Sequence, residues 1–302
     1  MNEIVGLILL LAAGGYALRK FGLVRPDAAR DLNQIILYLF LPALIFTLLH
    51  KAHLAWKVAA MPAMAWLAVG VGLLAAFLVG KLLRLPPALM ATFLLTSAMG
   101  NTTFLGYPIV RGFYDQAHLT LAILYDLLGS TLAVNTVGMA IAGGASSRGM
   151  APGAIARRLL AMPVLWALVL GLATRGIGIP APVERLLEGV GNLTVPMSMV
   201  TMGLALRISH LRHRWRLVLA SAGIKLMAIP VVVWMAARVL GLPLAFQQSA
   251  VLESAMPTMF YALNLAIFFD LDAAFVLGAI AVSSLLCMAT LPWWFWLLGR
   301  PW

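Results

Sequence analysis

The chain carries one pattern twice, and both copies interrupt an apolar segment at the same point. Ser97-Ala98-Met99 is followed by Gly100-Asn101, and Ser254-Ala255-Met256 is followed by Pro257-Thr258. Other positions recur 154 to 157 residues later, with Pro26, Pro42, Pro86 and Asp115 in the first copy and Pro180, Pro196, Pro243 and Asp270 in the second. Paired breaks in corresponding apolar segments are typical of the binding region of a transporter built from repeats. The pattern therefore predicts a membrane carrier.

The composition supports a membrane protein and excludes several other classes. The chain is 63% hydrophobic and 10% charged, whereas about a quarter of the residues of a soluble domain are charged. Although the net charge is +11, the 21 Lys and Arg residues lie mostly in short runs between apolar segments. Such runs orient a membrane protein, so we expect no nucleic-acid partner. The single cysteine, Cys287, excludes an intramolecular disulfide and a cysteine-based zinc site, and we expect no metal and no cofactor.

Ten segments are apolar enough to form helices across a bilayer, whose hydrocarbon core needs roughly 20 apolar residues per helix. They are residues 4–18, 32–49, 58–80, 88–110, 119–142, 159–174, 188–206, 217–237, 245–268 and 273–298. Five spans per copy is an odd number, so the second copy enters the membrane from the opposite face. We predict an all-α membrane protein of two inverted five-helix repeats, with broken helices 4 and 9 that cross at their breaks.

The loop charges predict the orientation of these spans. Thirteen of the 21 basic residues lie in loops on one side and seven on the other, and Lys225 lies within a span. The more basic side is expected in the cytoplasm, which places both termini outside a plasma membrane, for a bacterium the inner membrane. The first repeat is expected at 1–143 and the second at 159–302. Residues 144–158, rich in Gly, Ser and Pro, would form a cytoplasmic linker.

The two breaks are the candidate binding region. A helix is interrupted at membrane depth only where its freed backbone groups face protein or a wet cavity. Two helices that restart there would point their N-termini, with free N–H donors, at an anion such as a carboxylate. Ordinary kinks are the alternative interpretation. The candidate residues are Gly100, Asn101, Thr102, Thr103, Met256, Pro257 and Thr258.

Three ionisable residues lie within the spans, namely Asp126, Lys225 and Glu253. Charged groups inside a membrane protein are costly and often functional. They either form a structural ion pair between Lys225 and one carboxylate, or couple transport to H⁺ or Na⁺. The sequence leaves both hypotheses open.

The segment from Gly100 to Pro108 resembles the GNTxFLGxP signature of the auxin efflux carrier family. Four further stretches support the resemblance: residues 21–26, Leu41-Pro42-Ala43-Leu44-Ile45-Phe46, Leu124-Tyr125-Asp126 and Glu253-Ser254-Ala255-Met256-Pro257. The family includes plant auxin exporters and bacterial proteins described as malonate or malate permeases. Because the long loop of the plant exporters is missing, the chain is similar to the compact bacterial members.

The resemblance implies an elevator mechanism for a small organic anion, such as a dicarboxylate or an auxin-like acid. Spans 1, 2, 6 and 7 would form a scaffold that carries a homodimer contact, and spans 3–5 and 8–10 a mobile transport unit. Asn101 matches the family's crossover asparagine, and Pro257 lies at the second crossover.

Other classes fit the sequence less well. Tyr125-Asp126 is similar to half of an intramembrane aspartyl protease site, but the chain contains no Gly-Asp partner motif, and we predict that it is not an enzyme. A channel or receptor would not need matched helix breaks. A sodium-coupled symporter of the related bile-acid type is the remaining alternative, since unwound carbonyls near Asn101 and Glu253 would suit Na⁺.

Overall fold

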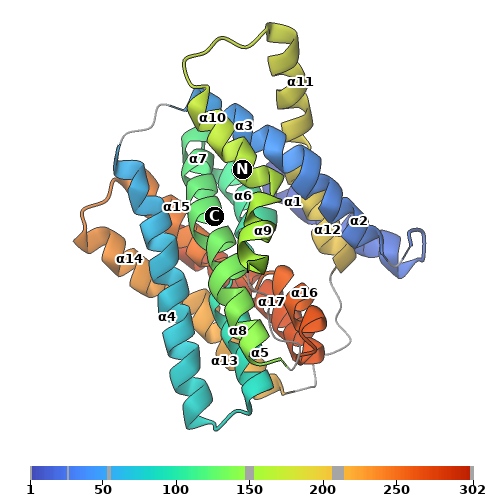
Figure 1. Cartoon of the computed structure of the whole chain (residues 1–302), viewed down its shortest axis with the longest axis vertical. Helices are drawn as coiled ribbons and strands as arrows, with labels where there is room; N and C mark the ends of the chain where they lie inside the picture. The colour runs from blue at the N-terminus through green and yellow to red at the C-terminus, as the bar shows by residue number, and fades with distance from the viewer. Residues whose placement is uncertain (1, 26, 53–55, 147–152, 206–213, 300–302) are drawn as a thin grey trace. The chain divides into compact units, whose positions relative to one another are not determined.

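The computed structural model describes residues 2–25, 27–52, 56–146, 153–205 and 214–299, and Figure 1 shows the order of their helices. These residues contain α-helices, π-helical turns and one short 3₁₀ helix, and the only β-type pairing among them is an isolated bridge. The all-helical prediction is confirmed. Pro26, the linker positions 147–152 and the basic segment 206–213 lie outside the described residues.

Five continuous helical stretches in the described chain are long and apolar enough to cross a membrane. They are Ala28–Lys51, Lys57–Leu82, Gln116–Gly144, Trp215–Val239 and Ala273–Leu297. A sixth candidate is the pair Ala154–Leu160 and Pro163–Ala173, bent by 54°. These stretches coincide with predicted segments two, three, five, eight, ten and six. Segments four and nine are broken, and segment seven consists of two helices that meet at Leu193.

Contacts within the chain divide it into two units. The first comprises residues 1–58, 103–123 and 158–206. Its helices are α1 (Asn2–Lys20), α2 (Ala28–Ile35), the π-turn η1 (Ile36–Phe40), α3 (Leu41–Lys51), α6 (Tyr107–Phe113), α10 (Pro163–Ala173), α11 (Ala181–Asn192) and α12 (Thr194–Ala205).

The second unit comprises residues 59–102, 124–157 and 207–302. Its helical elements are α4 (Ala60–Leu82), α5 (Pro87–Ala98), the π-turns η4 (Asp126–Thr131) and η5 (Val134–Gly138), α8 (Met139–Gly144), α13 (Trp215–Gly223), the π-turn η6 (Ile224–Ala228), α14 (Ile229–Val239), α15 (Leu244–Ser254), α16 (Tyr261–Phe268) and α17 (Ala273–Leu297). The chain passes between the units within η2 (Trp56–Ala59), η3 (Thr102–Gly106), α7 (Gln116–Tyr125) and α9 (Ala154–Leu160). A fifth passage lies between residues 206 and 207, outside the described residues.

Prolines and one acidic cap determine where several helices begin. Pro87 and Pro163 occupy the first turn of α5 and α10, where a missing N–H costs nothing because that group has no helical partner. The Asp272 side chain accepts a hydrogen bond from the Phe275 N–H (2.9 Å) and so caps α17. These starts are local properties of the sequence.

The first unit is held together by helices that approach each other at glycines. Along α1 and α12, a side chain at Gly15 would collide with the Val200 carbonyl oxygen, and one at Gly203 with that of Ala12. Along α3 and α10, a Cβ at Gly171 would lie 3.1 Å from the Phe46 carbonyl oxygen. Because Gly171 follows Gly15 by 156 positions, the same kind of contact occurs in both halves of the sequence. Small residues that allow close backbone approach are typical of helix pairs in membranes.

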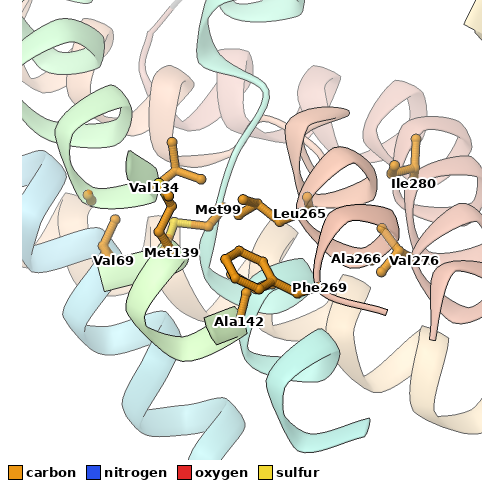
Figure 2. Close-up of a cluster of buried hydrophobic side chains, with 13 residues drawn as sticks. Val69, Met99, Val134, Met139, Ala142, Leu265, Ala266, Phe269, Val276 and Ile280 are labelled. Carbon is orange, nitrogen blue, oxygen red and sulfur yellow. The ribbon is translucent and has the colours of Figure 1, made fainter. Parts of the chain in front are cut away.

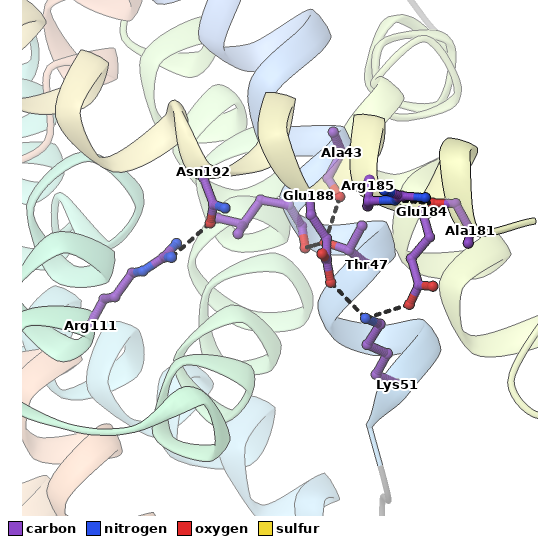
Figure 3. Close-up of polar contacts among 10 residues, drawn as sticks. Ala43, Thr47, Lys51, Arg111, Ala181, Glu184, Arg185, Glu188 and Asn192 are labelled. Atoms are coloured by element: carbon purple, nitrogen blue, oxygen red, sulfur yellow. Dashed lines mark hydrogen bonds and ion pairs between the residues drawn. The ribbon is translucent and has the colours of Figure 1, made fainter. Parts of the chain in front are cut away.

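Polar groups join α3 and α6 to α11, as Figure 3 shows. The Lys51 ammonium lies 2.6 Å from Glu188 Oε1 and also contacts Glu184. Arg111 donates to the Asn192 side-chain oxygen (2.7 Å). These side chains are partly solvent-exposed, and such ion pairs contribute at most about 1 kcal/mol each.

The core of the second unit is a cluster of apolar side chains from several helices (Figure 2). Met99 and Leu265 lie at its centre, and Val69, Met139 and Phe269 surround them. All are nearly inaccessible to solvent. Since Met99 belongs to the first break and α16 follows the second, this core packs directly against both breaks.

We predict that Gly15→Val lowers the stability of the folded protein by about 1–3 kcal/mol, because the new side chain would force α1 away from α12. The neighbouring Gly14→Val is the matched control, since nothing lies within 4 Å of a Cβ at Gly14. Thermal unfolding of both purified variants in detergent measures the difference. Equal midpoints for the two would contradict the proposed close packing.

Candidate functional site at the crossing of two broken helices

The two broken segments meet at their breaks. Gly100 and Thr258 form an antiparallel bridge. The Asn101 N–H donates to the Pro257 carbonyl oxygen (2.7 Å), and the Met259 N–H donates to the Met99 carbonyl oxygen (3.1 Å). Four backbone groups that the helix breaks release are thereby satisfied without water.

Local chemistry explains why each helix ends there. In the first segment α5 ends at Ala98, just before Gly100-Asn101, two residues with weak helix propensity. In the second, α15 ends at Ser254. Pro257 has no N–H and favours an extended conformation for Met256 before it. Met256 and Thr258 are fully buried.

Hydroxyl groups attach the second break to the first. Thr258 donates its hydroxyl to the Thr96 carbonyl oxygen (2.8 Å), and its N–H donates to Ser283 Oγ on α17 (3.1 Å). Ser221 on α13 in turn donates to Thr96 Oγ1 (3.1 Å). Each of these side chains is at least 99% buried. Thr258 is therefore held from two helices at once.

Asp126 holds the first break in a comparable way. Thr102 donates its hydroxyl to Asp126 Oδ1 (2.7 Å), and Thr131 donates to the same oxygen (3.1 Å). Asp126 and Thr102 are each 2% exposed. Ser283 follows Asp126 by 157 positions and Thr258 follows Thr102 by 156. Corresponding spans of the two copies thus supply the group that anchors each break.

Lys225 lies next to Gly100 and Ser254 and is 2% exposed. Its ammonium donates to the Ser254 carbonyl oxygen (2.6 Å), at the last residue of α15. A Cβ at Gly100 would lie 2.9 Å from Lys225 Cε and 3.0 Å from Nζ, so any larger residue at this position would make the end of the lysine side chain shift. The described part of the chain holds no ion pair for Lys225, and the direct pair with Asp126 or Glu253 that the sequence suggested is not formed.

Glu253 is fully buried one residue before the end of α15. Within the described residues, neither of its carboxylate oxygens accepts a hydrogen bond. It lies within electrostatic reach of both Asp126 and Lys225. An unpaired carboxylate is costly to bury, which distinguishes Glu253 from the hydrogen-bonded Asp126.

The predicted site residues therefore fall into two groups. Gly100, Asn101, Thr102, Met256, Pro257 and Thr258 form the crossing, together with Asp126, Lys225 and Glu253 in the same unit. Thr103 begins the chain's passage into the first unit and is partly exposed.

Sequence reasoning missed the π-helical turns on which two of the charges lie. Asp126 opens η4, and Lys225 lies in η6. In each turn a carbonyl accepts a bond from a tryptophan indole, Leu128 from Trp66 (3.0 Å) and Leu226 from Trp294 (3.1 Å). π-Helical turns often mark functional sites. In the sequence, only Trp66 and Trp294 could have indicated these π-helical turns, and tryptophans occur in many other settings.

We predict that Thr102→Val destabilises the protein by about 1.5–3 kcal/mol, because it removes a hydrogen bond to the buried Asp126 carboxylate. Thr92→Val is the matched control, since that fully buried hydroxyl bonds only to Ala88 and Leu89 carbonyls of its own helix. Comparing the thermal midpoints of both variants tests the role of Asp126. Equal loss in both would show that Thr102 contributes packing alone.

Comparisons with known proteins show the family of the chain. The profile of the family described as "Membrane transport protein" matches residues 1–295. An "Uncharacterized transporter" of Methanothermobacter thermautotrophicus is 31% identical over 303 residues, which cover 97% of each chain. An uncharacterized transporter of Methanocaldococcus jannaschii is 25% identical over 309 residues, 98% of each chain. The chain is a transporter rather than an enzyme, and it belongs to this membrane transport protein family, the auxin efflux carrier-like family that its Gly100–Pro108 motif indicates.

Proposed function

We propose that this protein is a secondary transporter of a small organic anion and that the crossing of the two broken helices binds it. The observation that carries the proposal is the backbone pairing of Gly100 with Thr258. Non-helical backbone within membrane-spanning segments is expected in a transporter whose unwound backbone contacts the substrate.

The chemistry of the breaks favours an anion. Each broken segment becomes helical again after its break, at Thr102 and at Tyr261. The first N–H groups of a restarted helix have no partner within the helix, and its N-terminus carries a partial positive charge. Asn101 adds a side-chain amide at the break. Carboxylates such as a dicarboxylate or an auxin-like acid match these donors.

We further propose ten spans in two inverted repeats, with both termini outside a plasma membrane. Support comes from contacts that recur in both copies of the sequence. Gly15 and Gly171 are both positions of close helix approach, and Thr102 and Thr258 are both anchored by a polar group of the fifth span of their repeat. The 13-to-7 distribution of loop charges supports the orientation.

Transport would follow an elevator mechanism. We assign spans 1, 2, 6 and 7 to a scaffold that forms a homodimer, and spans 3–5 and 8–10 to the moving part. The grouping of residues 1–58 with 158–206 in one unit supports the scaffold assignment. For spans 3–5 the support is only partial, because residues 103–123 belong to that same unit.

Asp126 and Glu253 are the groups through which a coupling ion would act. Glu253 supports a proton as the coupling ion, because its buried carboxylate has no hydrogen-bond donor among the residues that the structure describes. A sodium site would need several converging oxygens. A sodium-coupled carrier of the bile-acid type is the second candidate.

The topology is tested with two single-cysteine variants, Gly144→Cys and Gly178→Cys. Nothing lies within 4 Å of a Cβ at either glycine, and the native Cys287 is buried. With a membrane-impermeant maleimide we expect Gly144→Cys to react only from the cytoplasm and Gly178→Cys only from outside. Labelling from the reverse sides would overturn the orientation, and labelling of both from one side would overturn the odd number of spans between them.

We predict that Asn101→Ala weakens the binding of transported carboxylates at least tenfold, a loss of about 1.4 kcal/mol. Proteoliposome uptake of a panel of labelled mono- and dicarboxylates identifies the substrate, and competition measures its affinity for the variant. Asn264→Ala, an exposed amide on α16, is the control. Unchanged affinity in a folded Asn101→Ala protein would move the binding site away from the first break. If the panel yields no transported carboxylate, the anion proposal fails.

A further inference from the structure

We propose that the Lys225 ammonium is a built-in cation at the crossing, in the position where an ion-coupled carrier would hold Na⁺, and that the carrier therefore works without sodium. This inference rests on the proposed transport through the crossing. Lys225 would then be the residue that excludes sodium coupling and leaves the proton as the candidate coupling ion.

The Lys225 ammonium donates to a carbonyl at the end of a helix. Its Nζ lies 2.6 Å from the carbonyl oxygen of Ser254, which ends α15. The C-terminal end of a helix carries a partial negative charge and unsatisfied carbonyls. In transporters with broken helices, such ends and the unwound carbonyls beside them coordinate the coupling cation. Lys225 offers an ammonium to the same kind of ligand.

The position of the ammonium depends on both broken segments. A Cβ at Gly100 would lie 3.0 Å from Nζ, so the lysine fills the space that this glycine leaves free. The ammonium thus lies between Gly100 of the first break and the Ser254 carbonyl oxygen at the end of α15.

The charged groups near Lys225 also resemble those of an ion site. The titratable groups with an electrostatic effect on Lys225 are Glu253 on α15 and Cys287 on α17. Neither forms an ion pair with it in the described chain, although buried charges are ordinarily paired. A cation held by a backbone dipole with a carboxylate nearby is the arrangement of an ion site rather than of a structural salt bridge.

The lysine occurs in only one of the two copies of the sequence pattern. The position 157 residues earlier is Ala68, buried on α4. This position of the first copy therefore supplies no cation to the end of the half-helix α5. A single tethered ammonium cannot dissociate, so it can neutralise the crossing but cannot transmit a sodium gradient.

The test compares the thermal midpoint of purified protein without substrate in NaCl, KCl and choline chloride at equal ionic strength. We expect the wild-type midpoint to be the same in all three salts. Lys225→Ala empties the space that the ammonium occupies. We expect Na⁺ or K⁺ to raise the thermal midpoint of this variant saturably, by about 3 °C or more over its value in choline chloride. Two control variants should show no such rise. Lys225→Met fills the same space without a charge, and Lys81→Ala removes an exposed lysine.

Two outcomes overturn the proposal. One is a saturable, Na⁺-specific stabilisation or Na⁺-dependent uptake in the wild type. The other is a folded Lys225→Ala protein that responds equally to all three salts. If Lys225→Ala does not survive purification in choline, its yield in NaCl or KCl becomes the readout, and equally poor yields in all three salts also overturn the proposal. Because the thermal midpoints are measured without substrate, their result is independent of whether Asn101 binds the anion.

Discussion

The second unit depends on one constraint, that backbone groups freed by a broken helix cannot remain unpaired inside a membrane protein. In this chain the backbone groups of the two breaks form hydrogen bonds with each other. The bonds Asn101 N–H to Pro257 C=O and Met259 N–H to Met99 C=O join segments that are more than 150 residues apart. Neither break would be tolerable alone, so α5 and α15 must come together for either segment to fold. The apolar cluster around Met99 and the hydroxyl contacts of Thr258 then fix this crossing within its unit.

The three buried ionisable groups differ in how they are stabilised, and this difference indicates their separate roles. Asp126 accepts hydrogen bonds from two threonines and anchors a break. Lys225 donates to a helix-terminal carbonyl. Glu253 has no hydrogen-bond donor among the described residues. A group with a complete set of partners stabilises structure, whereas one without them is the group whose ionisation or movement changes the energy of the site most.

The first unit uses a different physical solution. Two of its helix pairs meet where glycines at 15, 171 and 203 allow backbones to touch, and its polar contacts at α11 are partly solvent-exposed. Close packing of small residues leaves little freedom, while a crossing held by a few hydrogen bonds concentrates polar groups in one place. The contrast suits a division into a supporting part and a binding part, as the proposed elevator mechanism requires.

The sequence by itself determined the features that depend on local chemistry. Hydropathy gave an all-helical membrane protein, Gly100-Asn101 and Pro257 gave the positions of the breaks, and the Gly100–Pro108 motif gave the family. Glycine and proline interrupt a helix whatever surrounds them, so these predictions needed no partner. Only the tertiary structure decided that Gly100 pairs with Thr258, that Asp126 and Lys225 lie on π-helical turns, and that Lys225 bonds to Ser254 rather than to a carboxylate. Each of these features depends on which atoms of another segment come within about 3 Å, a distance that hydropathy and spacing along the chain do not encode.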